Sequence, residues 1–291
     1  MQTYVWLIRR EFWENRAIWI VPAAIGVVLT FAVLFGKIDI VAAIPPEQQR
    51  LLGPQVLLAY GVTFFVVMSI YSSWYLLECL YADRKDRSVL FWKSMPISDI
   101  ATVISKLATA LLVIPLVYFI AADVSTLLMA FIVSLRAHSY FGSALWHPDL
   151  WLQLQALWLY VIVTTAVWYL PFTGWLLFVS AWAKRAVMLW LILPPLALYW
   201  TESWFFGSHV FGSQLAERAL GYVSRAFYDH SNPSAWATTV VGGDTITTPS
   251  SVWHLLNPIG FLSSAATWIG LAVGLILIYG AVELRLRRTE S

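Results

Sequence analysis

The side chains best placed to do chemistry in this sequence are ionisable groups inside apolar stretches, and Asp123 is the clearest of them. Asp123 lies about 25 Å along a helix from Lys106, at about 1.5 Å per residue. Burying such a group near the centre of a bilayer costs about 2.5–3.5 kcal/mol on insertion scales. Its carboxyl group could contact a substrate, gate a path, or donate a hydrogen bond to a neighbouring helix in its protonated form. The sequence leaves these roles open.

Tryptophans in the stretch 151–183 form a second candidate site. They fall into two sets with seven-residue steps, which places each set along one helix face: Trp151 and Trp158, then Trp168, Trp175 and Trp182. Trp168 and Trp175 could line a path for an apolar or amphiphilic substrate. Alternatively, the end residues belong to interfacial belts and the middle ones pack against neighbouring helices. Pro171 and Gly174 predict a kink in this stretch.

Residues 83–106 hold a third group of candidates. Charged residues come first, an apolar run follows, and Pro96 interrupts the run before Ser98, which can cap a helix that starts near Asp99. Such a segment between two spans can dock a cytoplasmic partner, or it can be a solvated loop that only anchors the orientation of the spans. The candidate contact residues are Asp83, Arg84, Arg87, Leu90, Phe91, Trp92 and Pro96.

The sequence contains no motif for catalysis or nucleotide binding. The phosphate-cradling pattern G-x-x-x-x-G-K-[ST] does not occur. Cys79 is the single cysteine, so neither an intramolecular disulfide nor a cysteine metal cluster can form. The five histidines lack ligand spacing and fall in predicted outer segments: His138, His147, His209, His230 and His254. We therefore expect no catalytic residue, no metal site and no cofactor on this chain.

The composition indicates whether the helices that carry these residues lie in water or in a membrane. The chain has 291 residues, of which 60% are hydrophobic and 12% are charged. Soluble domains carry about 25% charged residues, so this chain has too little charge to cover a surface in water. A net charge of +2 is too small to indicate nucleic-acid binding. The composition predicts an all-α integral membrane protein.

Six apolar stretches are candidates for spans of about 20 residues each. They lie at about 17–36, 55–82, 107–135, 151–183, 186–200 and 259–282, within a single transmembrane domain over 1–291. The fifth stretch is short and carries Pro194 and Pro195 near its far end. A short amphipathic helix over residues 3–15 is expected to lie on the inner leaflet before the first span.

The distribution of basic residues predicts the orientation of the spans. With both termini in the cytoplasm, 13 of the 18 Lys and Arg residues fall on the inner side, which follows the positive-inside rule. The large segment 201–257 then lies outside. Within it, residues 214–228 have the apolar spacing of an amphipathic helix. A loop rich in Ser, Thr, Gly and Asn is expected to follow through Pro249.

The segment between the second and third spans resembles the same region of ABC-2-type transporter permeases, the membrane subunits of a class of ATP-driven transporters. The matching pieces are Asp83-Arg84, Ser88-Val89-Leu90, Met95-Pro96-Ile97-Ser98 and Lys106-Leu107. The family often has Gly where this chain has Arg87, so the local turn can differ. The layout of spans is similar over the whole chain, whereas the motif covers only this segment.

The resemblance implies a permease that works in a pair, identical or mixed, with two cytoplasmic ATPase subunits that bind ATP and Mg²⁺. It places the ATPase contact at residues 83–96 and implies export across a bacterial inner membrane. The membrane lipid is the remaining expected partner.

Two other functions remain open from the sequence. The first is an integral-membrane enzyme that modifies lipids, with its site in the outer segment 201–257. It requires outer acidic residues and histidines to converge: Glu202, His209, Glu217, Asp229 and His230. The second is a membrane assembly or sensor subunit that binds a partner without moving a substrate.

Overall fold

The computed structural model describes residues 2–36, 46–85, 98–136, 145–227, 236–241, 244–249 and 252–287. This part of the chain is helical apart from one antiparallel hairpin of two strands, β1 (Trp236–Val241) and β2 (Asp244–Pro249). The helical class predicted from composition is thus confirmed, and the hairpin is an addition to it.

Five helices are long and apolar enough to cross a membrane: Ala17–Phe35, Gln55–Lys85, Asp99–Arg136, Pro148–Trp168 and Ala265–Arg287. They belong to α2 (Ala17–Phe35), α4 (Pro46–Lys85), α6 (Asp99–Ala108) with α7 (Ile114–Arg136), α9 (Pro148–Trp168) and α16 (Ala265–Arg287). Helices satisfy their own backbone hydrogen bonds, which is the requirement for crossing hydrocarbon. Apolar side chains such as Val28, Ile70 and Ile276 project outward and are about two-thirds exposed. An apolar outer surface of this kind can contact lipid. Several of these helices are therefore compatible with a position in a membrane.

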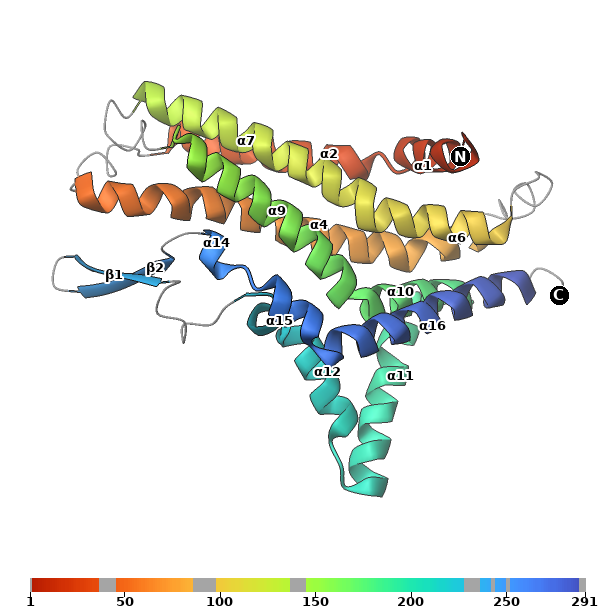
Figure 1. The fold of residues 1–291 in the computed structure, drawn as a ribbon. Coiled ribbons are helices and arrows are strands. Elements are labelled where there is room, and N and C mark those ends of the chain that lie inside the picture. The colour runs from red at the N-terminus through yellow and green to blue at the C-terminus, as the bar shows by residue number, and fades with distance from the viewer. Residues whose placement is uncertain are drawn as a thin grey trace.

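The long helices run side by side in a bundle (Figure 1). Helix α1 (Gln2–Glu14) and the last turn of α16 lie at one end, which we call the α1 end, together with the end of α4 and the start of α6. The strands β1 and β2 lie at the opposite end. Both described ends of the chain therefore sit at the same end of the bundle, and their predicted cytoplasmic orientation stays a prediction.

The predicted stretch 151–183 is two helices, because the chain breaks at Tyr169 between α9 and α10 (Leu170–Trp182). Pro171 lies in the first turn of α10, where its missing N–H costs no helical hydrogen bond. Gly174 has a different role from the predicted one. A Cβ atom there would lie 2.8 Å from the carbonyl oxygen of Gly274, so Gly174 permits close packing of α10 against α16.

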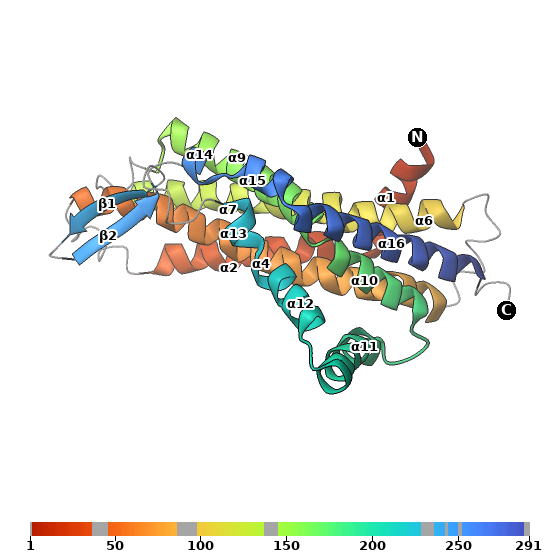
Figure 2. The same cartoon turned by 60° about the horizontal axis from the view of Figure 1, so that its bottom comes forward.

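The predicted fifth span, 186–200, does not run along the bundle. It forms α11 (Val187–Thr201), which extends away from the other helices and returns through η2 (Glu202–Phe206) and α12 (Val210–Leu220) as a helical hairpin (Figures 1 and 2). Fifteen helical residues span about 22 Å, short of the roughly 30 Å of a hydrocarbon core. Six spans therefore stay a prediction.

The segment predicted to lie outside, 201–257, contains more regular structure than the sequence predicted. The amphipathic stretch 214–228 falls on α12 and α13 (Tyr222–Ala226), which meet at Gly221. The expected loop through Pro249 contains β1 and β2, paired from Trp236 opposite Pro249 to Val241 opposite Asp244. Threonine and valine in these strands favour this pairing. Two short helices, α14 (Val252–Leu255) and α15 (Pro258–Ser263), lead into α16.

Candidate functional site

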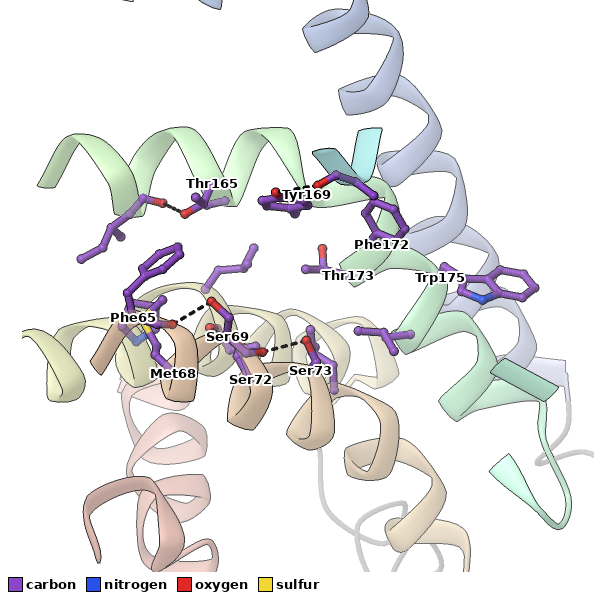
Figure 3. Close-up of a pocket in the computed structure, with 18 of the residues that line it drawn as sticks. Phe65, Met68, Ser69, Ser72, Ser73, Thr165, Tyr169, Phe172, Thr173 and Trp175 are labelled. Atoms are coloured by element: carbon purple, nitrogen blue, oxygen red, sulfur yellow. Dashed lines mark hydrogen bonds between the residues drawn. The ribbon is translucent and has the colours of Figure 1, made fainter. Parts of the chain in front are cut away.

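A cavity of about 550 Å³ lies among the middle parts of the long helices. Helix α4 forms one wall, and the end of α9 with the start of α10 forms the facing wall (Figure 3). Leu191 of α11 and Ala219 of α12 add the side formed by the helical hairpin. This volume lies within the range of 300–1,000 Å³ that is usual for small-molecule sites.

The helices that bound the cavity are irregular at this level. Between α6 and α7 the chain forms a π-helical segment, η1 (Thr109–Val113), and the break at Tyr169 lies on the other side. The hydroxyl of Ser72 on α4 donates to the carbonyl oxygen of Ala110 in η1 at 2.9 Å. Irregular backbone at membrane depth is tolerated where it is packed in protein or lines a cavity, and π-helical turns are frequent at functional sites.

Six hydroxyl groups line this otherwise apolar cavity: Ser69, Ser72, Ser73, Thr165, Tyr169 and Thr173. Figure 3 shows the three serines on α4 opposite Thr165, Tyr169 and Thr173. None of the described residues that line the cavity is Asp, Glu, Lys, Arg or His. The cavity therefore offers polar oxygen atoms without formal charge.

The two predicted tryptophans lie in different surroundings. Trp175 lines the cavity, and its indole N–H donates to the carbonyl oxygen of Leu191 at 3.2 Å. Trp168 is fully buried outside the cavity and donates to the carbonyl oxygen of Arg218 at 2.8 Å. The Arg218 guanidinium lies 4.3 Å from the centre of the Trp168 ring. A spacing of seven does not keep them on one face because the break at Tyr169 falls between them.

Asp123 is half-buried on α7 and does not line the cavity. Its carboxyl oxygen accepts a hydrogen bond from the side-chain amide of Gln155 on α9 at 2.9 Å. Of the roles left open by the sequence, this contact corresponds to a hydrogen bond between helices, although with Asp123 as acceptor. The substrate-path role of Asp123 stays a prediction.

A network of buried ion pairs lies at the α1 end of the bundle. Lys106 of α6 lies 3.0 Å from Glu11 of α1 and 3.3 Å from Asp83 of α4. Arg285 of α16 lies 3.2 Å from Asp83 and 2.9 Å from Asp99 of α6. We call these five residues the ion-pair network. Tyr75 of α4 extends it, since its hydroxyl donates to Glu11 at 2.8 Å.

The network joins four helices from distant parts of the chain. Glu11, Asp83, Lys106 and Arg285 are each at most 9% exposed, so each charge depends on its partners for the solvation that water would supply. Glu11, Lys106 and Arg285 were not predicted from the sequence as site residues. Their charged types in otherwise apolar surroundings were the available signal, but spacing along the chain does not indicate pairing between helices.

The predicted partner-contact segment begins beside this network. Both carboxyl oxygens of Asp83 are engaged by Lys106 and Arg285, so Asp83 lies inside the network. Arg84 donates to the carbonyl oxygen of Ser180 and, at 3.0 Å, to that of Ala183, and so holds the end of α4 against the end of α10. The remaining candidates lie outside the described residues: Arg87, Leu90, Phe91, Trp92 and Pro96. The prediction that Ser98 caps α6 is confirmed, since its hydroxyl accepts from the Ala101 N–H at 3.2 Å.

Glu202, a candidate of the lipid-enzyme hypothesis, caps α12. Its carboxylate accepts from the backbone N–H groups of Val210 and Phe211 at 2.7 and 2.8 Å, and from the Ser208 hydroxyl at 2.9 Å. Desolvation acts to raise the pKa of Glu202, but these hydrogen bonds together lower it below its usual range.

His209, a second member of that hypothetical outer site, lies beside Glu202, because its chain neighbours Ser208 and Val210 both donate to the Glu202 carboxylate. Glu217 pairs with Arg225 at 2.8 Å on an exposed surface. Asp229 and His230 lie outside the described residues. Among the residues that the structure does describe, no group of three or more His, Cys, Asp or Glu side chains could hold a metal ion.

No protein-family model, no curated protein and no solved structure matches this chain. Its function is therefore inferred from the helices, the cavity and the ion-pair network.

Proposed function

We propose that this chain is the permease subunit of an ATP-driven transporter of the ABC-2 type, working with a separate cytoplasmic ATPase. The observation that carries the proposal is the cavity in the middle of an apolar helical bundle, bounded by a π-helical segment and a helix break. Apolar helices that surround a partly polar cavity provide a place for a substrate between the two membrane surfaces.

The ion-pair network supplies a route for coupling to such a partner. Residues 86–97 are preceded by Asp83 and Arg84 and followed by Asp99, and two of these three residues belong to the network. A partner that displaces this segment therefore acts on α4 and α6 directly. Through Glu11 and Arg285 it also acts on α1 and α16.

Helix α6 then connects the network to the cavity. Lys106 lies three residues before the π-helical segment that contacts Ser72 in the cavity wall. A small displacement of α6 would therefore change that wall. The proposed cycle is ATP-driven closure of two ATPase subunits, displacement of residues 86–97, and rearrangement of the cavity.

The remaining features of the proposal come from the resemblance and from the charge distribution. The permease works as an identical or mixed pair, in a bacterial inner membrane, with both termini in the cytoplasm. ATP and Mg²⁺ bind to the partner subunits, and the direction of transport is export.

Purification from the native host in mild detergent tests this function. We expect an ATPase subunit to co-purify in stoichiometric amount, and Arg84→Ala and Phe91→Ala to release it. Arg225→Ala is the matched control because this arginine is exposed on the α12–α13 side of the molecule. A chain that purifies alone from every native preparation, without ATPase activity, contradicts the proposal. A partner that stays bound but drives no ATP-dependent substrate movement favours the assembly or sensor subunit.

A further inference from the structure

The hydroxyl groups of the cavity share one property: each already donates its proton to a backbone carbonyl oxygen. Ser69 donates to Phe65 at 2.9 Å, and Ser73 donates to Ser69 at 2.8 Å. Ser72 donates to Ala110, as described above. On the facing wall, three further hydroxyls do the same: Thr165 to Val161, Tyr169 to Ala219 and Thr173 to Leu170.

This bonding decides which hydrogen-bonding role remains for a ligand. A hydroxyl has one proton to donate and two lone pairs to accept with. Since the protons are engaged, the oxygens remain as acceptors. The indole N–H of Trp175 is engaged as well, by Leu191. The cavity thus presents acceptors on apolar walls, with no cationic side chain among the described residues that line it.

The cavity has a neighbouring hollow on the side of α11. It has a volume of about 390 Å³, lies between α4 and α11, and shares Ser69 and Ser73 with the cavity. This hollow is lined by Ile70, Trp74 and Met188, which are 65%, 50% and 44% exposed. Its exposed lining is apolar, so a molecule dissolved in hydrocarbon can approach the serines directly.

We infer that the cavity binds an uncharged, largely apolar molecule that presents a hydrogen-bond donor, such as a long-chain alcohol or a secondary amide. This inference rests on the proposed transport function for its biological meaning and names the class of substrate. An anion is disfavoured because it would meet acceptor oxygens and no positive charge. An ether of the same size is disfavoured because it has no proton to donate to those oxygens.

Photolabelling tests the inference. The probe is hexadecanol carrying a diazirine, added to the full chain in vesicles of phosphatidylcholine together with any ATPase that co-purifies. Peptide mass spectrometry locates the label. We expect it in the part of α4 that carries the three serines and around Thr173 of α10. We expect dodecanol to compete about tenfold better than methyl dodecyl ether or dodecanoate.

Variants on α4 distinguish cavity binding from general partitioning into the membrane surface of the protein. The double variant Ser69→Ala, Ser73→Ala removes two of the six acceptors and should reduce the preference for alcohol over ether several-fold. Thr63→Ala is the matched control, because Thr63 lies outside the cavity and makes the same bond to the carbonyl four residues earlier, at 2.9 Å. Ser73→Phe should block labelling, whereas Thr63→Phe should not.

Equal competition by alcohol and ether overturns the inference, and so does label spread over outward-facing residues such as Val28 and Val62. The outcome is separable from that of the proposed function. Selective labelling of a chain that has no ATPase partner supports the site and contradicts the transporter. An ATPase complex that moves a substrate, but shows no preference for hydrogen-bond donors at this cavity, supports the transporter and contradicts the proposed site.

Discussion

The ammonium group of Lys106 lies 3.0 Å from a carboxyl oxygen of Glu11, although 95 positions separate the two residues in the chain. Both side chains are 3% exposed. The contact fixes α1 against α6 at the α1 end of the bundle, and Asp83 and Arg285 extend it to α4 and α16. Four helices that enclose this end thus depend on one set of charges.

Removing Lys106 should therefore be strongly destabilising. Lys106→Met leaves Glu11 and Asp83 buried without their shared cation, which should lower the free energy of unfolding by about 3–5 kcal/mol. Unfolding in mixed detergent micelles measures it. Arg225→Met is the control, since it breaks an exposed pair worth about 0–1 kcal/mol. Equal losses in the two variants would show that burial of the network carries no extra energy.

A double-mutant cycle should show that the pair acts as a unit. Glu11→Gln and Lys106→Met together should cost clearly less than the sum of the single variants, because the second change removes a charge that the first left unpaired. The same unfolding measurement gives the coupling energy. Strict additivity would argue against direct pairing of Glu11 with Lys106.

Trp168 should contribute more to stability than Trp204, an exposed tryptophan of the helical hairpin formed by α11, η2 and α12. Trp168→Ala removes a fully buried ring together with its hydrogen bond to Arg218, and should cost about 3–5 kcal/mol. Trp204, which is 85% exposed, is the control. Thermal unfolding of both alanine variants makes the comparison. A Trp168→Ala protein as stable as Trp204→Ala would contradict the packing of α12 over α9.

The close contact of α10 with α16 should not tolerate a larger residue at Gly174. A Cβ atom there meets the backbone of Gly274 at 2.8 Å, and backbone cannot move aside as a side chain can. Gly174→Ala should therefore be less stable than Gly280→Ala by about 1–3 kcal/mol. In the control, the nearest atom is the movable Phe178 ring, at 3.0 Å. Equal melting temperatures would mean that the helices separate at no cost.

The cap of α12 should weaken in acid. Because hydrogen bonding lowers the pKa of Glu202 in the folded protein, its stabilising contribution is present above the ordinary pKa of 4.5. It is lost as pH falls through the lowered folded value. Hydrogen-exchange protection at Val210 and Phe211 should therefore drop several-fold at low pH. Glu202→Ala should show the low protection already at pH 7, and should be insensitive to pH over the same range.

The membrane class and most of the helices were predictable from the sequence, because both depend on local properties. Low charge and stretches of about 20 apolar residues indicate helices that are long and apolar enough to cross a membrane. The cap at Ser98 and the helix at the N-terminus were likewise readable, since each depends on residues a few positions apart. Residues 3–15 and α1 differ only at the ends.

The contacts between residues on different helices became visible only in the tertiary structure. Helical periodicity tells which side chains share a face but not which helix lies opposite. The pairing of Glu11 with Lys106, the contact of Gln155 with Asp123 and the cavity between α4 and α10 therefore had no local signal. The break at Tyr169 separated two tryptophans that a continuous helix would align, and α11 extends away from the bundle although it is longer than α10, which packs along α16. Contacts between helices depend on packing of distant segments, so they appear only once the chain is folded.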